Sequence, residues 1–239
     1  MAAHAEGAIY NNVKTSANGQ ASHAEGAGTR ALVDATHTEG ILTLAGRTYE
    51  EAQYAAVDLN MSFDSSEELY MKLLGYGAHA EGTNTQALGS SSHAEGSLTQ
   101  ALVNSSHAEG DSTYARGEAS HAEGYDTTAS GNQSHAEGKS TLASGNSSHA
   151  EGKESKATGY CTHAEGLNTL AQGLYSHAEG IETIASGSTS HAEGNSTTAS
   201  GEASHAEGGY YDPYEEDYLE EFVIDDLGIS ITSTTAAGI

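Results

Sequence analysis

The chain has 239 residues, a formal net charge of −26, no Trp, two Phe, one Pro and twenty-nine Gly. So few large apolar side chains exclude a large apolar core, and eight Lys and Arg against thirty-four acidic residues exclude a basic surface for nucleic acid. The single Cys161 excludes an intrachain disulfide framework. No apolar run approaches the ~20 residues that span a bilayer, so no membrane insertion is expected.

The motif His-Ala-Glu-Gly recurs through most of the chain. From His79 to His205 it returns every fourteen residues in ten copies, and three further copies begin at His4, His23 and His37, the last of which reads His-Thr-Glu-Gly. All thirteen histidines occupy this motif position. A strict period predicts a stacked repeat, although the low hydrophobicity taken alone would suggest disorder.

A second segment, Thr-x-Ala-x-Gly, lies between successive motifs, as at Thr141-Leu142-Ala143-Ser144-Gly145. Both segments place small residues at every second position, which is the periodicity of a strand, and both end on or near Gly. We therefore expect two short strands per turn around a thin interior of Ser, Ala, Thr and Gly. His and Glu then point outward.

Residues 1–46 are expected to form N-terminal β-roll turns with one loop insertion. The interval from His4 to His23 is nineteen residues, and the excess of five falls around Ile9 to Asn12. The interval from His37 to His79 is forty-two, which is one turn plus an insertion of twenty-eight residues. Residues 47–76 of this interval predict a small α-helical hairpin, because 49–57 has a helical pattern and Ser65, Glu68 and Gly75 supply start and stop signals.

Residues 77–208 predict a regular β-roll shaft. Residues 209–239 form an acidic, aromatic terminal segment, in which Asp212-Pro213-Tyr214-Glu215 is typical of a helix start. Apolar residues follow at helical spacing as far as Val223, Gly228 is expected to end the helix, and 229–234 predicts a strand. The fold class is therefore all-β, with a helical insertion and a short helix–strand end.

The pattern Ser-x-Ala-x-Gly and Thr-x-Ala-x-Gly at a fourteen-residue period resembles the head repeat of trimeric autotransporter adhesins. This YadA-like or Hep/Hag repeat also occurs in bacteriophage tail and appendage fibres, and the resemblance covers nearly all of 1–208 apart from the two insertions. It implies a left-handed parallel β-roll that assembles as a homotrimer. The family typically has Val and Ile where this sequence has His135 and Glu137, so the implied trimer seam is polar.

Stacking of successive turns at about 4.8 Å would place His above His and Glu above Glu, in two ladders along a rod of roughly 60 Å. Stacked carboxylates repel one another, so each needs a donor, a cation or a partner chain. The ladders are therefore predicted to form an interface. The predicted oligomer-interface residues are His149, Glu151, His163, Glu165, His177 and Glu179, together with Tyr214, Tyr218 and Phe222.

His and Glu two residues apart on one strand face also have the spacing of metal ligands, with Zn²⁺ or Ni²⁺ as the expected ion. This metal hypothesis concerns His79, Glu81, His93, Glu95, His107, Glu109, His121, Glu123, His135 and Glu137. The alternative is hydrogen-bonded His-Glu packing across the trimer. Repetition of one pair thirteen times favours this scaffold role over a metal site, so no metal and no cofactor is predicted.

An enzyme is not expected, because no copy of the repeat contains an additional nucleophile together with its own base. A pH response is a further hypothesis: if Glu raises the folded-state pKa of His, the resulting stability is present at low pH and lost as pH rises through that pKa. A melting temperature that is flat from pH 5 to 8 would count against it.

The sequence predicts a structural fibre segment of a bacteriophage or phage-derived particle. It would act as a rigid trimeric spacer and as a candidate host-attachment element for a cell-surface receptor or glycan. The alternative is a self-assembling extracellular filament whose subunits join end to end through 210–239; a fragment of a surface adhesin is a weaker alternative. The amino terminus has no signal-peptide pattern and the adhesins' membrane anchor is not found, which favours a virion or another extracellular particle.

Overall fold

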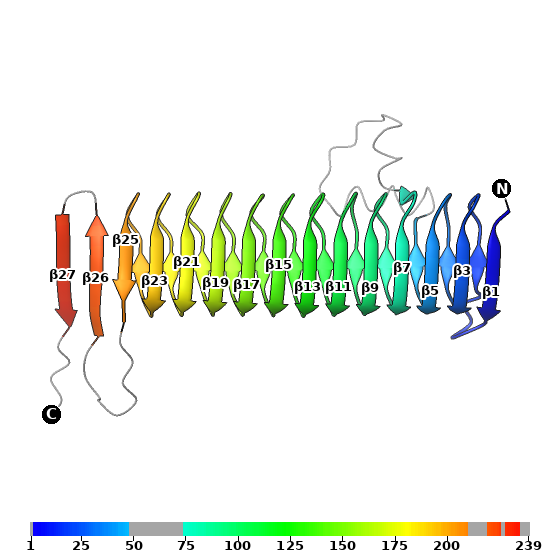
Figure 1. Ribbon diagram of the computed structural model, residues 1–239, viewed down its shortest axis with the longest axis horizontal. Coiled ribbons are helices and arrows are strands. Elements are labelled where there is room, and N and C mark those ends of the chain that lie inside the picture. Colours follow the sequence, from blue (N-terminus) through cyan, green and yellow to red (C-terminus); the bar gives the residue numbers. More distant parts are fainter. Residues whose placement is uncertain (1, 48–73, 210–218, 226–227, 235–239) are drawn as a thin grey trace, which may run out of the picture. The chain divides into compact units, whose positions relative to one another are not determined.

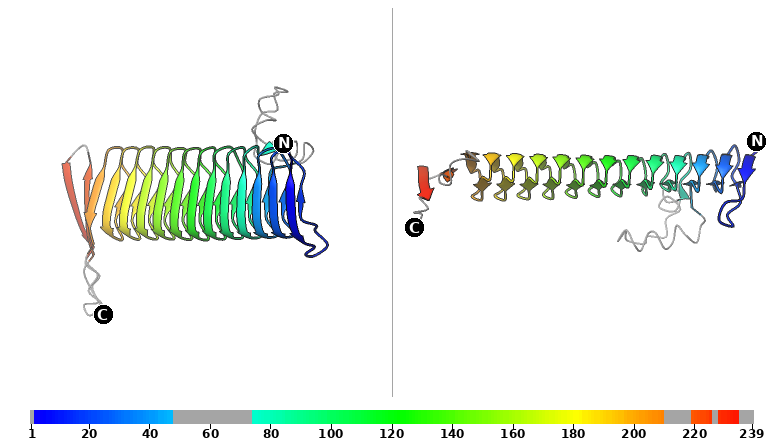
Figure 2. Two further views of the ribbon diagram at one scale, coloured as in Figure 1. Left: turned by 45° about the vertical axis from the view of Figure 1, so that its right-hand side comes forward. Right: turned by 90° about the horizontal axis from the view of Figure 1, so that it is seen from below.

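The computed structural model describes residues 2–47, 74–209, 219–225 and 228–234. The chain divides into two compact units, Met1–Gln133 and Ser134–Ile239, and each is described by itself. Both units are built from parallel strands, a long one and a short one in each fourteen-residue coil. Figure 2 shows the long and short strands of each unit as two facing layers.

The first unit contains seven long strands and seven short ones among its described residues. The long strands are β1 (His4–Ala8), β3 (His23–Ala27), β5 (His37–Ile41), β7 (His79–Thr83), β9 (His93–Ser97), β11 (His107–Asp111) and β13 (His121–Tyr125). The short strands are β2 (Ser16–Ala17), β4 (Arg30–Ala31), β6 (Leu44–Ala45), β8 (Gln86–Ala87), β10 (Gln100–Ala101), β12 (Tyr114–Ala115) and β14 (Thr128–Ala129).

The second unit continues the same pattern and ends in a pair of antiparallel strands. Its long strands are β15 (His135–Lys139), β17 (His149–Lys153), β19 (His163–Leu167), β21 (His177–Ile181), β23 (His191–Asn195) and β25 (His205–Gly208). Its short strands are β16 (Leu142–Ala143), β18 (Lys156–Ala157), β20 (Leu170–Ala171), β22 (Ile184–Ala185) and β24 (Thr198–Ala199). The final pair is β26 (Leu219–Asp225) and β27 (Gly228–Thr234).

Within each unit the parallel strands pair in register, so each residue of the motif lies beside its own copy in the next coil (Figure 1). His163 pairs with His177 and Ala164 with Ala178. The pairing continues across the long insertion, because His37 pairs with His79 although forty-two residues separate them. The predicted parallel β-roll of fourteen-residue coils is therefore confirmed, and the second insertion leaves its register unchanged.

The first insertion is a tight hairpin. Tyr10 and Val13 exchange backbone hydrogen bonds of 3.0 and 2.8 Å, and Asn11 and Asn12 between them have φ of 47° and 64°. Two central residues with positive φ form the type I′ geometry that two-residue hairpins prefer, and Asn tolerates that conformation better than most residues. The five extra residues predicted in the first turn thus leave the coil as a loop.

The interior of each coil is filled by small side chains. Ala164 and Ala171, which represent the long and the short strand, are both 0% exposed, and Thr169 and Ser176 are 1% exposed. The inward Ser hydroxyl is satisfied locally: in the coil of Ser190, its Oγ donates to the Gly187 carbonyl at 2.8 Å. Two strands this close leave no room for larger residues, as the small-residue pattern predicts.

The corners of the coil stack as regularly as its strands. Each seven-residue half ends on a residue with left-handed backbone, such as Cys161 with φ 53° and Asn168 with φ 54°. The N–H of each corner donates to a corner carbonyl of the preceding coil, from Cys161 to Asn146 at 2.9 Å and from Asn168 to Lys153 at 2.8 Å. These bonds satisfy backbone groups that a turn would otherwise leave unpaired, which offsets the cost of left-handed geometry in residues other than Gly.

The predicted helical hairpin at 47–76 lies largely outside the described residues. At its ends, the Arg47 N–H donates to the Leu74 carbonyl at 2.9 Å. The Arg47 guanidinium is buried and donates to the carbonyls of Leu88 at 3.2 Å and Leu102 at 2.9 Å, which follow short strands of the next two coils. Arg47 therefore fastens the base of the insertion to the roll.

The C-terminal segment differs from its prediction. The helix expected to run to Val223 is wrong from Leu219 onward, because Leu219–Asp225 forms β26 and pairs antiparallel with β25, His205 opposite Ile224. The last long strand of the roll presents an open edge of backbone groups, and a β-branched and aromatic sequence satisfies them as a strand. The predicted strand at 229–234 is confirmed as β27, and Gly228 begins it rather than ending a helix.

Candidate functional site

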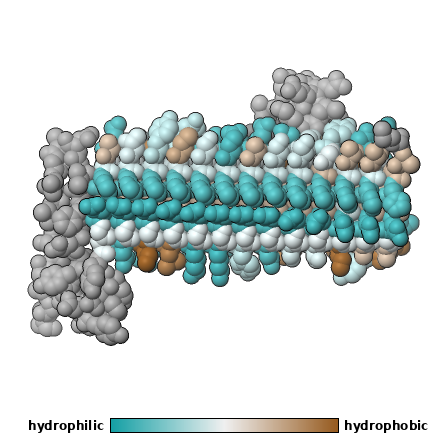
Figure 3. Space-filling model, in the orientation of Figure 1, coloured by the Kyte–Doolittle hydropathy of each residue, from teal (hydrophilic) through white to brown (hydrophobic). Residues whose placement is uncertain are grey.

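The outward side of the long strands carries the repeated His and Glu side chains. Strand alternation turns Ala inward and exposes its two neighbours, so in β19 Ala164 is buried while the side chains of His163 and Glu165 keep exposed fractions of 36% and 35%. Figure 3 shows the result as continuous hydrophilic rows along this face of the long strands. We call these two rows in each unit the His-Glu ladder.

The imidazole rings of the ladder stack on one another. Ring centroids of His79 and His93 are 4.8 Å apart with planes 10° from parallel, and those of His163 and His177 are 4.7 Å apart with planes 3° from parallel. Stacking ends at the first coil, where His4 meets His23 edge-on at 74°. The spacing of the rings follows the strand spacing, so the ladder is a direct product of the register.

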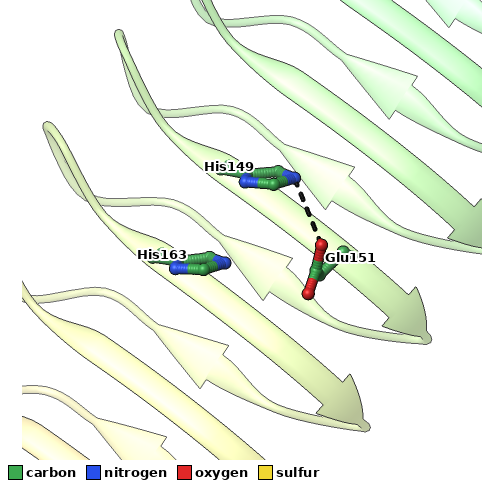
Figure 4. Close-up of side chains that lie close together, drawn as sticks. All are labelled: His149, Glu151 and His163. Atoms are coloured by element: carbon green, nitrogen blue, oxygen red, sulfur yellow. Dashed lines mark ion pairs between the residues drawn. The ribbon is translucent and has the colours of Figure 1, made fainter.

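In most of the described long strands the carboxylate lies beside the imidazole of the same strand, and several carboxylates also lie near the imidazole of the following coil. In unit 2, Glu151 Oε2 is 3.7 Å from His149 Nε2 (Figure 4), and Glu179 lies 3.8 Å from both His177 and His191 through its two oxygens. These separations exceed ordinary hydrogen-bond lengths. The imidazole nitrogens and the carboxylate oxygens of the ladder are therefore close neighbours that form no short hydrogen bonds.

Every predicted ladder pair is brought together by the structure. The same-strand Nε2–Oε2 distances are 3.4 Å for His79–Glu81, 3.6 Å for His93–Glu95, 3.8 Å for His107–Glu109, 3.8 Å for His121–Glu123, 3.9 Å for His135–Glu137, 3.7 Å for His149–Glu151, 3.6 Å for His163–Glu165 and 3.8 Å for His177–Glu179. Of the three C-terminal interface predictions, Tyr214 and Tyr218 lie outside the described residues, and Phe222 lies on β26 opposite Glu207.

Comparison with protein families identifies the repeat. Residues 108–134, 136–160 and 164–190 match the YadA head domain repeat. These residues carry YadA head repeats. The comparison with curated proteins gives no match. Because this repeat builds adhesin heads, the match indicates an adhesin-like structural role rather than an enzymatic one. Among the described residues, no helix is long and apolar enough to cross a membrane.

Several histidines of the ladder have a pKa below that of an isolated imidazole. Burial lowers the pKa of His149 and His177, and the flanking imidazoles lower it further, outweighing the neighbouring carboxylates. The same causes lower the pKa of His79. The hypothesis that Glu raises the histidine pKa is therefore wrong for these residues, because the nearest group above and below each ring is another imidazole.

The glutamates of the YadA head repeats share protons along their row. Hydrogen bonding with the Glu137 carboxyl, burial, and hydrogen bonding with Glu165 raise the pKa of Glu151 to about 7. Burial acts to raise the pKa of Glu165, but hydrogen bonds from Glu179 and Glu151 outweigh it, so this pKa is lowered. Glu151 is thus protonated more readily than its neighbour Glu165, which lessens the repulsion between these two carboxyls.

Two features of the YadA head coils were not found from sequence. Arg47 is buried with carbonyl partners, and its only signal is a guanidinium placed directly after a half-motif Gly at the start of the insertion. Tyr160 and Tyr175 form an edge-on aromatic pair with centroids 5.6 Å apart, and they remain 46% and 57% exposed. The two tyrosines are fifteen residues apart, one more than the repeat period, so the fourteen-residue pattern does not predict their contact.

Proposed function

We propose that the chain is a structural fibre segment that assembles as a homotrimer through its His-Glu ladder. It would serve as a rigid spacer in a bacteriophage or phage-derived particle, on a virion or otherwise outside the cell. The repeat match supports the structural role. The phage or phage-derived particle rests on the sequence resemblance to the repeats of phage tail and appendage fibres. The observation that carries the proposal is the repetition of one outward pair in every coil.

The proposed trimer is supported by interactions that the His and Glu side chains of the ladder do not make within one chain. Nε2 of His149 and His163 has almost no accessible surface and no hydrogen-bond partner among the described residues, while the carboxylates between them crowd one another. Partner chains can supply donors to the carboxylate row, where the Glu151 and Glu165 side chains keep 33% and 35% of their surface exposed. If the chains are related by rotation about an axis along the roll, every coil makes the same contact with the partner chains. A closed ring of chains also leaves no free face to which further chains could add.

An attachment role would use the surface that the ladder leaves free. The exposed pair Tyr160 and Tyr175 lies at the corners of the coil, with Leu174, 52% exposed, directly before Tyr175. Clustered exposed aromatic and apolar side chains mark binding surfaces more often than isolated ones do. A cell-surface receptor or glycan is the proposed partner of this cluster.

The trimer is tested by measuring molar mass in solution by light scattering. The untagged chain is expected to have the mass of three chains. The double variant His163→Lys, His177→Lys would place six fixed positive charges at the seam of a trimer, and it is expected to have the mass of one chain. The matched control is Leu170→Lys on short strand β20, where the neighbouring β18 already has Lys156 at the paired position. A wild-type mass of one chain would overturn the proposal.

A filament is the second candidate, and one observation favours it. Because β26 is antiparallel to β25 and β27 is antiparallel to β26, β27 runs in the same direction as β25. Its sequence, Gly-Ile-Ser-Ile-Thr-Ser-Thr, has no charge or Pro to protect the edge that it presents. A strand from the roll of another copy could therefore add to β27 in the parallel sense.

The original form of the filament hypothesis had the terminal segment docking on the next molecule, but β26 instead pairs with the chain's own β25. Deletion of 210–239 distinguishes the candidates. A trimer sealed by the ladder keeps its mass after the deletion. A filament that grows through β27 loses its large, concentration-dependent mass.

A further inference from the structure

The strongest unassigned feature is the donor set of the ladder. In unit 2, His149, Glu151 and His163 offer ligand atoms that lie within 4.8 Å of one another, and so do His163, Glu165 and His177. A third set is formed by His177, Glu179 and His191. Each combines two imidazole nitrogens with a carboxylate oxygen, and all three groups come from one chain (Figure 4).

The nitrogen-to-oxygen distances suit a shared ion better than a hydrogen bond. Nε2 of His163 lies 3.6 Å from Glu165 Oε2, and Nε2 of His191 lies 3.8 Å from Glu179 Oε1. Two ligands bound at about 2.0–2.1 Å in tetrahedral geometry are themselves about 3.4 Å apart. The two imidazole nitrogens of a site lie within 4.8 Å of each other, so they would approach by up to about 1.4 Å to reach this separation. Because the successive rings stack with planes 3° from parallel, both rings would also have to turn so that their in-plane lone pairs point to one ion.

A second observation concerns the solvent exposure of the same nitrogen atoms. The Nε2 atoms of His149, His163, His177 and His191 are almost inaccessible to solvent and have no hydrogen-bond partner among the described residues. A buried polar atom without a partner is costly, and coordination would satisfy it. The ion pairs of Glu151 and Glu165 in the described chain are with imidazoles, so the carboxylate row has no fixed cation from Lys or Arg there.

We propose that the His-Glu ladder binds divalent transition-metal ions, Zn²⁺ or Ni²⁺, each held by two successive imidazoles and the glutamate between them. Imidazole with carboxylate suits these ions, whereas Mg²⁺ and Ca²⁺ prefer sites made of oxygen alone. Adjacent sites share a histidine, so both cannot fill through the same Nε2 atom. With two histidines per ion, the thirteen histidines allow at most six ions per chain, since thirteen divided by two leaves one over.

This inference goes beyond the proposed function, because all three ligands of a site belong to one chain. It predicts binding whether the chain is a monomer or a trimer. In a trimer, ions in the seam would also neutralise the stacked carboxylates. Light scattering on each sample used for the binding measurement reports the oligomeric state separately, so failure of one proposal does not imply failure of the other.

The test is calorimetric titration of untagged, chelator-stripped full-length chain with Zn²⁺, and with Mg²⁺ as the second probe. Zn²⁺ is expected to bind with up to six ions per chain and to raise the melting temperature, and Mg²⁺ to do neither. The triple variant Glu151→Gln, Glu165→Gln, Glu179→Gln is expected to lose about tenfold or more in Zn²⁺ affinity at the overlapping sites of His149, His163, His177 and His191, of which at most two can be filled at once.

The matched control is Glu154→Gln, Glu182→Gln, Glu202→Gln, which removes three exposed acids of the same unit that lie off the ladder. It changes the net charge equally and should keep the wild-type stoichiometry and affinity. Equal losses in the two variants would reduce the effect to general electrostatics and overturn the proposal. Folded wild-type chain that binds Zn²⁺ more weakly than ~1 mM would also overturn it.

Discussion

The long and short strands of the coil have the same kinds of inward-facing residues but different outward-facing residues. Ala is fully buried on both, and Ser or Thr beside it is buried as well. On the outward side, the long strands repeat His and Glu, whereas the short strands vary freely. In regular coils their outward residues are Gln86, Gln100, Tyr114, Thr128, Leu142, Lys156, Leu170, Ile184 and Thr198.

This difference separates the demands of folding from those of function. Interior volume fixes the small residues on both strands, because two facing layers leave space only for Ala, Ser and Thr. The fold places no such demand on the outward side, since Lys156 and Leu170 occupy paired positions in β18 and β20. The repetition of His and Glu therefore requires another cause, and the proposed seam and ion sites each supply one.

The largest expected effect is on the Gly of the long strand. A Cβ at Gly152, where φ is 95°, would lie 2.2 Å from the Gly166 carbonyl oxygen of the next coil. Gly152→Ala combines backbone strain with a clash against backbone, and we expect it to cost about 4 kcal/mol or more in the free energy of unfolding. Urea denaturation followed by circular dichroism measures the loss.

The control for this glycine is Gly77→Ala. Gly77 also has positive φ, 66°, but a Cβ there would meet nothing within 4 Å. It should cost only the strain of left-handed Ala, about 1–2 kcal/mol. Equal losses at Gly152 and Gly77 would show that conformation, and not contact between coils, makes the long-strand Gly necessary.

The next effect tests whether the two strands have the same interior. Ala164→Leu in β19 and Ala171→Leu in β20 each insert a branched side chain at a fully buried position, and each should cost about 1–3 kcal/mol or more through overpacking. Similar melting temperatures are expected for the two variants. If only the long-strand variant were destabilised, the interior beside the short strand would have space for a larger side chain, although Ala171 is fully buried.

The coil and its register could be predicted from sequence because one period governs both. Fourteen residues return the chain to the same point, so the copies at His37 and His79 pair although an insertion separates them. The C-terminal strand could not be predicted in the same way. Phe222 fits a helical pattern as well as a strand, and the choice is made by the open edge of β25, which lies outside the local sequence.

The ladder pairs could be predicted, but their protonation could not. Alternation places Glu151 beside His149 on one face, which the sequence shows. The stacking of His149 on His163 at 4.8 Å requires the coil spacing and the ring orientation, and this contact, with burial, sets the direction of the pKa shift. Local pairing favours a charged imidazole, whereas the stack favours a neutral one.

The short-strand side contains one residue whose identity should matter. Arg47 donates to the carbonyls of Leu88 and Leu102, and Arg47→Ala would leave these groups without that donor, at a cost of about 1–3 kcal/mol. Thermal unfolding measures the loss. Lys156→Ala is the control, because Lys156 lies exposed on β18, and we expect little change there. Equal melting temperatures for the two variants would contradict the bridging role.

The smallest effect concerns pH and separates the two rows of the ladder. His149 and His177 have a folded-state pKa lowered from the ordinary imidazole value of 6.5, so their stabilisation is present above that value and lost as pH falls through the folded pKa. Glu151, with a pKa raised to about 7 from 4.5, acts oppositely: its contribution is present at low pH and lost as pH rises through about 7. Between pH 7 and 5 the two rows oppose each other, so a nearly flat melting profile is compatible with titration of both.

Removing a carboxyl of the Glu row should therefore reveal the pH dependence that the His row causes. Glu151→Gln eliminates the opposing carboxyl, and its melting temperature should fall more steeply between pH 7 and 5 than that of the wild type. Glu202→Gln, an exposed acid off the ladder, should keep the wild-type profile. If Glu151→Gln made the melting temperature less sensitive to acid than the wild type, the carboxyl would be a source of acid sensitivity rather than a counterweight. The carboxyl row would then have to be ionised throughout, and the imidazoles alone could not account for the profile.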